Sequence, residues 1–290
     1  MPHKLVSLSF LPIGNHVDNY ADIFLFDVHN RCQHLLRQTL KRDTARSESM
    51  DLPIRLGVLT PSSNTALEPL TSALAATLPL CSAHFSRFKV TDISLSEQAL
   101  GQFDDAPILA AAELLADARV NVIGWSGTSA GWLGFDRDAR LVERIHERTG
   151  IRATTAVLAL NELLALRNIT RLALMTPYTA DVQRRIVDNY RANGIDVVAE
   201  RHLGISVNHD FAQVEPAQLE AMVADVSSCA PQAITTFCTN LRAADMAPQI
   251  EARWGIPLLD TVSTTMWGML RAVGRDPRAI RGWGQLFEWA

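Results

Sequence analysis

A pair of turn motifs occurs twice in this chain, and the repeat restricts the folds that it can adopt. In the first copy Thr60-Pro61 ends one apolar segment, and Gly127 follows a later one. In the second copy Thr176-Pro177 and Cys238 stand in the corresponding places. Each copy is typical of two buried strands that end in turns. Two similar halves facing each other would place a glycine on one side of a cleft and a thiol on the other.

Length and charge exclude several classes of protein. A chain of 290 residues can bury a full core in one or two domains. The net charge of -4 gives no basic footprint for nucleic acid and no polybasic membrane patch. No run approaches the ~20 apolar residues that span a bilayer. We therefore expect neither nucleic acid nor a membrane as a partner.

The cysteines and histidines do not form a recognisable metal or disulfide pattern. There is no CxxC pair and no HxxxH pair, so we predict no metal site and no disulfide framework. A cytoplasmic location is the corresponding expectation, and a homo-oligomer is left open. Any single cysteine is commonly a small buried hydrophobe, a reading that we favour for Cys81 and Cys229.

The first fifty residues differ from the rest of the chain. Residues 5–13 are apolar but are followed by no clear cleavage site, and residues 41–50 are charged and polar as in a linker. Three interpretations are a disordered tail, a small accessory segment and a start codon assigned too early, which is the one we favour. The predicted divisions are a poorly structured extension, a first lobe and a second lobe, at residues 1–50, 51–165 and 166–290.

Strands and helices alternate from residue 54 onward. Apolar runs bounded by turns predict strands at 54–59, 84–90, 120–125, 171–175, 195–200, 232–237 and 256–260. Helical patterns lie at 64–78, 106–118, 136–148, 155–166, 179–192, 216–226, 241–254 and 263–273. This order predicts an α/β fold of two pseudo-symmetric, flavodoxin-like lobes with mostly parallel sheets. Since ligands of parallel sheets bind beyond the carboxyl ends of the strands, the four turns should meet at an inter-lobe active-site cleft.

Small polar residues at these turns are candidates for binding an anion. Backbone N–H groups and hydroxyls at Thr128 and Ser129 suit a carboxylate or an enediolate, although a simple Ser/Thr turn has the same composition. The Pro61-Ser62-Ser63-Asn64 turn also suits a carboxylate, with helix capping by Asn64 as the alternative. Tyr178 follows the second proline and is either an oxyanion donor or a packed side chain.

Cys238 is the candidate for acid or nucleophile. A thiol between a strand end and a helix start would feel the positive end of the helix dipole, which lowers its pKa and raises its reactivity. Thr239 and Asn240 follow it and continue the polar turn. A buried structural cysteine is the alternative.

Together these motifs resemble the maleate isomerase and arylmalonate decarboxylase branch of the aspartate/glutamate racemase superfamily. The matching stretches are P-S-S-N-T (61–65) with Glu68, G-T-S (127–129), T-P-Y (176–178) and C-T-N-L-R (238–242). The resemblance covers roughly residues 54–275.

The resemblance implies a cofactor-independent enzyme that binds a dicarboxylate between two lobes. Racemases and maleate isomerases of this superfamily carry a cysteine in each lobe, whereas the decarboxylases have glycine at the first position. Gly127 matches that first position and Cys238 the second. Thr128, Ser129 and Tyr178 match enediolate donors, and the Pro61–Asn64 turn looks like the isomerase version, so the motif set is mixed.

Decarboxylation of a substituted malonate or related dicarboxylate is the reaction that needs the fewest groups. The leaving carboxylate needs an apolar pocket, for which Trp125, Trp132, Leu133 and Phe135 are candidates. Donors must hold the enediolate, and one acid, Cys238, must protonate the carbanion. The alternatives are a maleate-type cis-trans isomerase and a racemase-like carboxylate-binding protein without turnover.

Overall fold

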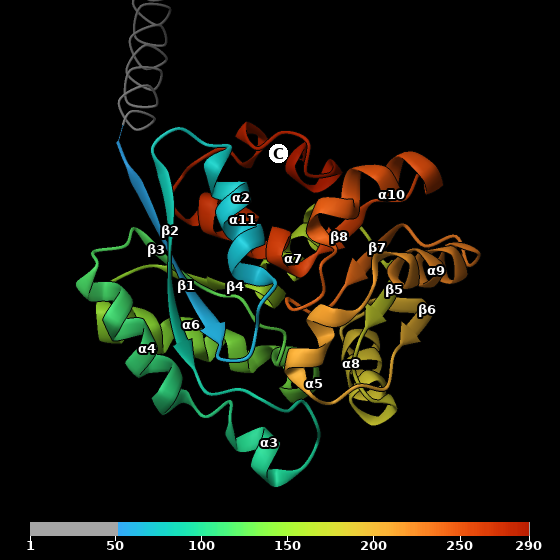
Figure 1. The fold of residues 1–290 in the computed structure, drawn as a ribbon, viewed down its shortest axis with the longest axis horizontal. Coiled ribbons are helices and arrows are strands. Elements are labelled where there is room, and N and C mark those ends of the chain that lie inside the picture. Colours follow the sequence, from blue (N-terminus) through green and yellow to red (C-terminus); the bar gives the residue numbers. More distant parts are fainter. Residues whose placement is uncertain (1–51, 290) are drawn as a thin grey trace, which may run out of the picture. The chain divides into compact units, whose positions relative to one another are not determined.

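The computed structural model describes residues 52–289, and the expectations for the N-terminal fifty residues fall outside this range. Within it, two four-stranded parallel sheets are covered by helices (Figure 1). The predicted α/β class is therefore confirmed. No helix in residues 52–289 combines the length and the hydropathy that crossing a membrane requires.

The first sheet has the strand order β2-β1-β3-β4, with every neighbouring pair parallel. Its strands are β1 (Ile54–Pro61), β2 (Cys81–Phe88), β3 (Val122–Trp125) and β4 (Ala153–Thr155). The helices of this lobe are α2 (Leu67–Ala76), α3 (Glu97–Gly101), α4 (Asp105–Asp117), α5 (Ala130–Leu133), α6 (Phe135–Thr149) and α7 (Ala156–Leu166).

The second sheet repeats the pattern in the order β6-β5-β7-β8, again all parallel. Its strands are β5 (Arg171–Thr176), β6 (Asp196–His202), β7 (Ala233–Thr236) and β8 (Leu258–Asp260). The helices are α8 (Ala180–Ala192), α9 (Pro216–Ser227), α10 (Ala247–Trp254) and α11 (Thr261–Ala272), with short 3-10 helices at Asn208–Gln213, Ala244–Met246, Pro277–Ala279 and Gln285–Phe287.

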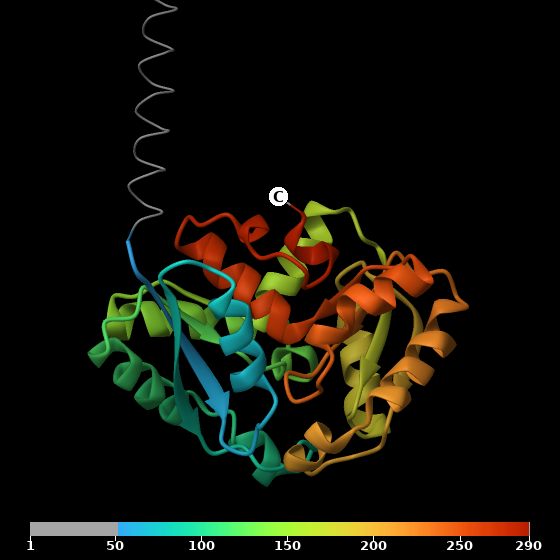
Figure 2. The same cartoon turned by 45° about the horizontal axis from the view of Figure 1, so that its top comes forward.

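The matching strand orders make the two lobes pseudo-symmetric, with β1 equivalent to β5 and β3 equivalent to β7 (Figure 2). We propose that the boundary between the lobes lies in the connection from α7 to β5. Because carboxyl ends of parallel strands lie on one edge of a sheet, the turns after these four strands are brought together.

The last helix of the second lobe packs on the first sheet, and this contact joins the two cores. Helix α11 contacts α7, β3 and β4. The approach is close enough that glycine is needed: a Cβ at Gly124 would lie 2.5 Å from the Met269 sulfur, and one at Gly268 would lie 2.7 Å from the Ala159 Cβ. Any larger residue at Gly124 or Gly268 would push this helix off the sheet.

Two predicted helices begin later than the sequence pattern indicates. The helix expected at 64–78 is α2, which starts only at Leu67. The expected helix at 241–254 is α10, which starts only at Ala247 after a 3-10 turn. The preceding residues are held in a turn by long-range bonds of the Asn240 side chain, described below. The short elements β4, α3 and α5 were also missed, since each spans five residues or fewer.

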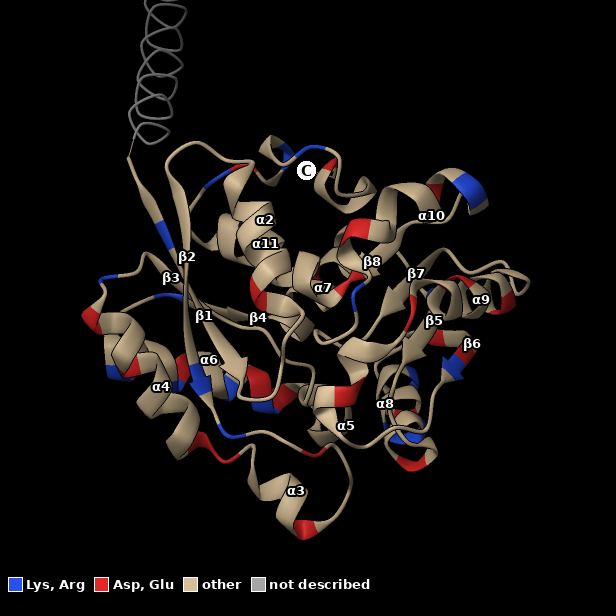
Figure 3. Cartoon of the chain, in the orientation of Figure 1, with Lys and Arg blue, Asp and Glu red and all other residues tan. Residues whose placement is uncertain are grey.

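Charged residues of both signs alternate on the outer helices (Figure 3). Arg144 and Arg148 of α6 pair with Asp105 and Glu113 of α4, at exposed or half-buried positions. Pairs of this kind stabilise a fold only slightly. The ion pairs of Arg144 and Arg148 link α6 to α4. Because each arginine is paired with a carboxylate, they do not form a basic surface.

Asp138 differs from these surface groups, since its carboxyl group is buried inside the first lobe. Burial raises its pKa to about 7, and a hydrogen bond from Thr155 opposes the shift. At this site the folded protein therefore binds more protons than the unfolded chain between about pH 4 and pH 7, so the contribution of Asp138 to stability falls as the pH rises through that range.

We expect Asp138→Asn to raise the free energy of unfolding at pH 8 by on the order of 1–3 kcal/mol, because the amide accepts the same hydrogen bond without a buried charge. Near pH 4 the variant and the wild type should be equally stable. Urea denaturation at both pH values measures this, with the exposed Asp117→Asn as control. An equal effect at pH 4 and pH 8 would contradict the assignment of a buried ionisable carboxyl.

Candidate active site between the two lobes

A small cavity lies where the four turns meet. Its volume is about 20 Å³, which is room for roughly one water molecule. Most of the predicted site residues line it: Pro61, Gly127, Thr128, Ser129, Tyr178, Cys238 and Thr239. A dicarboxylate does not fit this volume, so substrate binding requires the cavity to enlarge.

Four other predicted site residues, Ser62, Ser63, Asn64 and Asn240, do not line the cavity. The side chains of Ser63, Asn64 and Asn240 instead connect the lobes. Asn64 Nδ2 donates to Thr239 Oγ1 at 3.2 Å. Asn240 Oδ1 accepts from the backbone N–H groups of Thr65 and Ala66 at 3.0 and 3.2 Å. We call these bonds the inter-lobe clasp, because they join residues at the carboxyl ends of β1 and β7.

The serines of the first turn belong to the same polar region. Ser63 Oγ donates to the Val90 carbonyl at 2.6 Å and accepts from Asn208 Nδ2 at 2.8 Å. Ser62 Oγ also donates to the Val90 carbonyl, at 3.3 Å. The sequence predicts Asn64 as the N-cap of α2, but this helix begins at Leu67 with Ala66 as its N-cap residue. Asn64 Oδ1 still accepts from the N–H groups of Ala66 and Leu67 at 3.0 and 2.9 Å, just before the helix. These groups are occupied within the protein in this closed form.

The donors that remain are at Thr128, Ser129 and Tyr178. Thr128 Oγ1 and the Tyr178 hydroxyl are 2.7 Å apart across the lobes. Among residues 52–289, no acceptor takes the backbone N–H groups of Thr128 and Ser129. These N–H groups and the paired hydroxyls belong to residues that line the cavity, and neutral donors of this kind are able to hold an oxyanion.

Cys238 is buried, and its environment differs from the sequence expectation. No helix starts directly after it, so the predicted lowering of its pKa by a helix dipole is wrong. Burial raises the pKa of the thiol to about 12, although Tyr178 and the N–H groups of Asn240 and Leu241 favour the thiolate. Burial and the nearby thiol together raise the pKa of Tyr178 well above its usual value. Both groups are therefore protonated at neutral pH.

Gly127 is glycine because the Trp125 ring occupies the space beside it. A Cβ at position 127 would lie 2.1 Å from Cζ2 of Trp125. The ring is held by Phe88, whose centroid is 5.0 Å away. The first lobe therefore has no room for a second thiol in this arrangement.

Aromatic side chains form much of the remaining wall. Trp132 packs edge-on against Tyr178, with centroids 5.3 Å apart, and both line the cavity with Trp125. Leu133 and Phe135, the other two candidates for the wall, do not line it; Phe135 packs on Tyr190 instead. The sequence analysis missed Val90, Ile93, Phe103 and Asn208. The first three come from connecting segments without a recognisable motif, and Asn208 begins a short 3-10 helix.

No metal site is evident in the part of the chain that the structure describes: residues 52–289 contain no group of three His, Cys, Asp or Glu side chains placed to hold an ion. The cavity wall also carries no Lys, Arg or His. Any anion bound here would be held by neutral donors.

The two parallel-sheet lobes with a shared cavity define the branch of the aspartate/glutamate racemase superfamily that contains maleate isomerases and arylmalonate decarboxylases. The family model described as arylmalonate decarboxylase matches residues 75–287. The chain therefore belongs to the arylmalonate decarboxylase family.

Curated relatives carry both activities of this branch. A maleate isomerase from Pseudomonas putida is 27% identical over 248 residues, covering 81% of this chain and 98% of the relative. An arylmalonate decarboxylase from Bordetella bronchiseptica is 31% identical over 171 residues, covering 58% and 71%. Sequence similarity supports the family and leaves the activity open.

Solved structures share the fold. The crystal structure of the maleate isomerase Iso from Pseudomonas putida with maleate has a TM-score of 0.76 at 26% identity, covering 82% of this chain and 99% of that one. A crystal structure of arylmalonate decarboxylase has a TM-score of 0.66 at 23% identity, covering 81% and 100%.

We expect Gly127→Cys to destabilise the protein by about 1–3 kcal/mol, because the new Cβ displaces the Trp125 ring. Combining it with Trp125→Leu should cost less than the sum of the two single changes, since the smaller side chain makes room. Urea denaturation of the three variants measures this coupling. Gly101→Cys is the control, because a Cβ there meets nothing within 4 Å. Strict additivity would show that the ring does not occupy this space.

We expect Cys238 to resist alkylation. With a pKa near 12, only about one thiol in 10⁴ is ionised at pH 8, and the sulfur is buried. Iodoacetamide at pH 8, followed by peptide mass spectrometry, should label the exposed Cys229 long before Cys238. Equal labelling rates at the two positions would contradict a protonated, buried thiol.

Proposed function

We propose that this protein is a cofactor-independent decarboxylase of a substituted malonate or related dicarboxylate. The observation that carries the proposal is the asymmetry of the cavity, with one protonated thiol, Cys238, on the second lobe and a glycine with an indole ring on the first. One acid is enough for decarboxylation, whereas a two-base reaction needs a titratable group on each side.

In the first step the bond between the central carbon and one carboxylate breaks. The electron pair moves into the remaining carboxylate to give an enediolate, and carbon dioxide leaves. The apolar wall disfavours the charge of the departing carboxylate. The Thr128 and Ser129 N–H groups and the Thr128–Tyr178 hydroxyl pair hold the new oxyanion charge, and each such donor is worth roughly 3–4 kcal/mol.

In the second step Cys238 gives its proton to the carbon. A neutral thiol is the required form, and it is the form that burial maintains at neutral pH. The resulting thiolate is stabilised by the N–H groups of Asn240 and Leu241 and by Tyr178. Solvent returns the proton when the product leaves.

The protonated state of Cys238 and the glycine at position 127 disfavour isomerisation through a covalent adduct. Attack on an alkene requires a thiolate, and burial raises the pKa of the Cys238 thiol to about 12, which disfavours the thiolate at neutral pH. The family resemblance implies that the attacking cysteine belongs to the first lobe, where this chain has Gly127.

A maleate-type cis-trans isomerase is the second candidate. It is supported by the near-complete coverage of maleate isomerase relatives and by the fold match to the isomerase bound to maleate. A related Nocardia farcinica isomerase carries a covalently bound succinylcysteine intermediate. For this chain Cys238 would then have to act as nucleophile and proton shuttle alone.

A product screen separates the candidates. Malonate, methylmalonate, phenylmalonate and maleate would each be incubated with the protein, and carbon dioxide and fumarate would be measured. We expect carbon dioxide from a substituted malonate and no fumarate from maleate. Fumarate formation would establish the isomerase, and ligand binding without any product would establish a carboxylate-binding protein.

We expect Cys238→Ala to lower kcat by at least 10²–10⁴-fold while substrate still binds, because it removes the general acid without charging the cavity. Steady-state kinetics and calorimetry measure the two effects separately. Cys229→Ala, at an exposed position, is the control and should behave as wild type. Full activity of Cys238→Ala would refute the proposed mechanism.

A further inference from the structure

Three buried tryptophans have an indole N–H without a hydrogen-bond partner among the described residues: Trp125, Trp132 and Trp267. Buried donors are rarely left unpaired, because the unmade bond costs free energy. Trp125 and Trp132 both line the cavity that contains Cys238, whereas Trp267 does not. Two of the three unpaired indole donors are thus found at the site where a ligand is expected. The other unpaired buried side-chain groups in the described part of the chain, the hydroxyls of Thr179, Tyr190 and Ser263, do not line this cavity.

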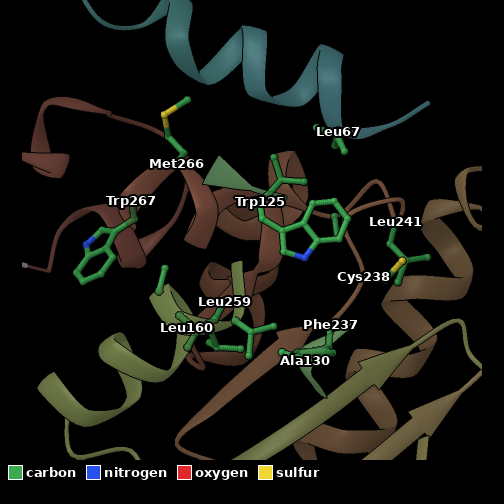
Figure 4. Close-up of a cluster of buried hydrophobic side chains, with 14 of the residues drawn as sticks. Leu67, Trp125, Ala130, Leu160, Phe237, Cys238, Leu241, Leu259, Met266 and Trp267 are labelled. Carbon is green, nitrogen blue, oxygen red and sulfur yellow. The ribbon is translucent and has the colours of Figure 1, made fainter. Parts of the chain in front are cut away.

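The orientation of Trp125 follows from its contact with the Gly127 turn. A Cβ at position 127 would lie 2.1 Å from Cζ2 and 2.5 Å from Cε2, and Cε2 is bonded to Nε1. Cη2 also lies 2.5 Å from that position, so the benzene edge of the ring packs on the turn, and the indole N–H lies next to this edge, one bond from Cε2. The backbone N–H groups of Thr128 and Ser129 in the same turn have no acceptor among the described residues either. In Figure 4 the ring extends from its strand toward Cys238, and Trp267 lies apart from both.

Because the cavity wall carries no positive charge, the binding of an anion depends on its neutral hydrogen-bond donors. No cationic side chain lines it, so a dianion must be held by N–H and O–H groups alone. Indole nitrogen is a donor and never an acceptor, so Trp125 can only bind an electron-rich oxygen. One ordered water in the cavity is the other occupant that would satisfy it.

We propose that the indole N–H of Trp125 is a substrate-binding donor to a carboxylate oxygen, acting from the first-lobe side while Cys238 acts from the second. The inference rests on the proposed function, since it takes the ligand to be a dicarboxylate. Trp125 would then replace the side chain that Gly127 lacks: it excludes a second thiol and supplies a hydrogen bond in its place.

The first test is a ¹⁵N–¹H spectrum of the indole groups in Cys238→Ala, which prevents turnover. The chain has six tryptophans, and Trp→Phe variants assign the signals of Trp125 and Trp267. The ligands are malonate, methylmalonate, phenylmalonate and maleate, and the tightest binder is carried forward. We expect it to shift the Trp125 signal downfield and leave that of Trp267 unchanged.

The second test compares Trp125→Phe with Trp267→Phe in the same background. Both changes remove the same atoms from a buried, unpaired indole, so their effects on packing are matched. We expect Trp125→Phe to raise the dissociation constant of the ligand by about 10- to 100-fold, as for a lost hydrogen bond to a charged group. Trp267→Phe should leave it unchanged. Urea denaturation confirms that both variants fold.

The outcomes separate this inference from the proposed function. Equal affinity of the Trp125→Phe and Trp267→Phe variants, or an unmoved Trp125 signal, would overturn the inference even if a malonate is decarboxylated, and would assign the donor to a bound water. Weakened binding by Trp125→Phe without turnover of any diacid by wild type would support the inference and refute the decarboxylase. Failure of all four ligands to bind would overturn both.

Discussion

The inter-lobe clasp is the interaction on which the site depends. Asn64 and Asn240 lie at the carboxyl ends of β1 and β7, and their amides bind Thr239 and the backbone of Thr65 and Ala66 across the lobes. These bonds are buried, where an unmade partner is costly, so they fix the two turns relative to each other. Cys238 directly precedes Thr239, the first clasp residue after β7, so the clasp also sets the position of the Cys238 thiol. Polar side chains that looked like substrate ligands in sequence therefore act by holding the cavity together.

The cavity that results is asymmetric in shape and in chemistry. On the first lobe, the Trp125 ring fills the space beside Gly127 and leaves no room for a second acid. On the second, Cys238 is protonated because burial outweighs its hydrogen bonds. A proton donor is the chemical role that such a thiol suits best, and an apolar wall with neutral donors suits the loss of a carboxylate.

Much of this architecture could be predicted from the sequence, because alternating apolar strands and amphipathic helices have strong local signals. Gly150 ends α6 in the left-handed conformation, as its residue type indicated. Asn64 accepts from the N–H group of Leu67, but α2 begins three residues later than the pattern predicted. The delayed start of α10 could not be predicted, since Asn240 bonds to residues about 175 positions away. The pKa of Cys238 was predicted in the wrong direction, because burial depends on the packing of both lobes. The contact of Trp125 with Gly127 was also missed, although the two are close in sequence, since it depends on the rotamer of the ring.

The stereochemical course of the reaction tests the central claim most directly. A prochiral disubstituted malonate would be decarboxylated in D₂O, and the monoacid product analysed for deuterium content and enantiomeric composition. With one acid on one side of the cavity, the product should carry a single deuterium at the former central carbon and be one enantiomer. A racemic product would contradict delivery of the proton by Cys238 from a single face.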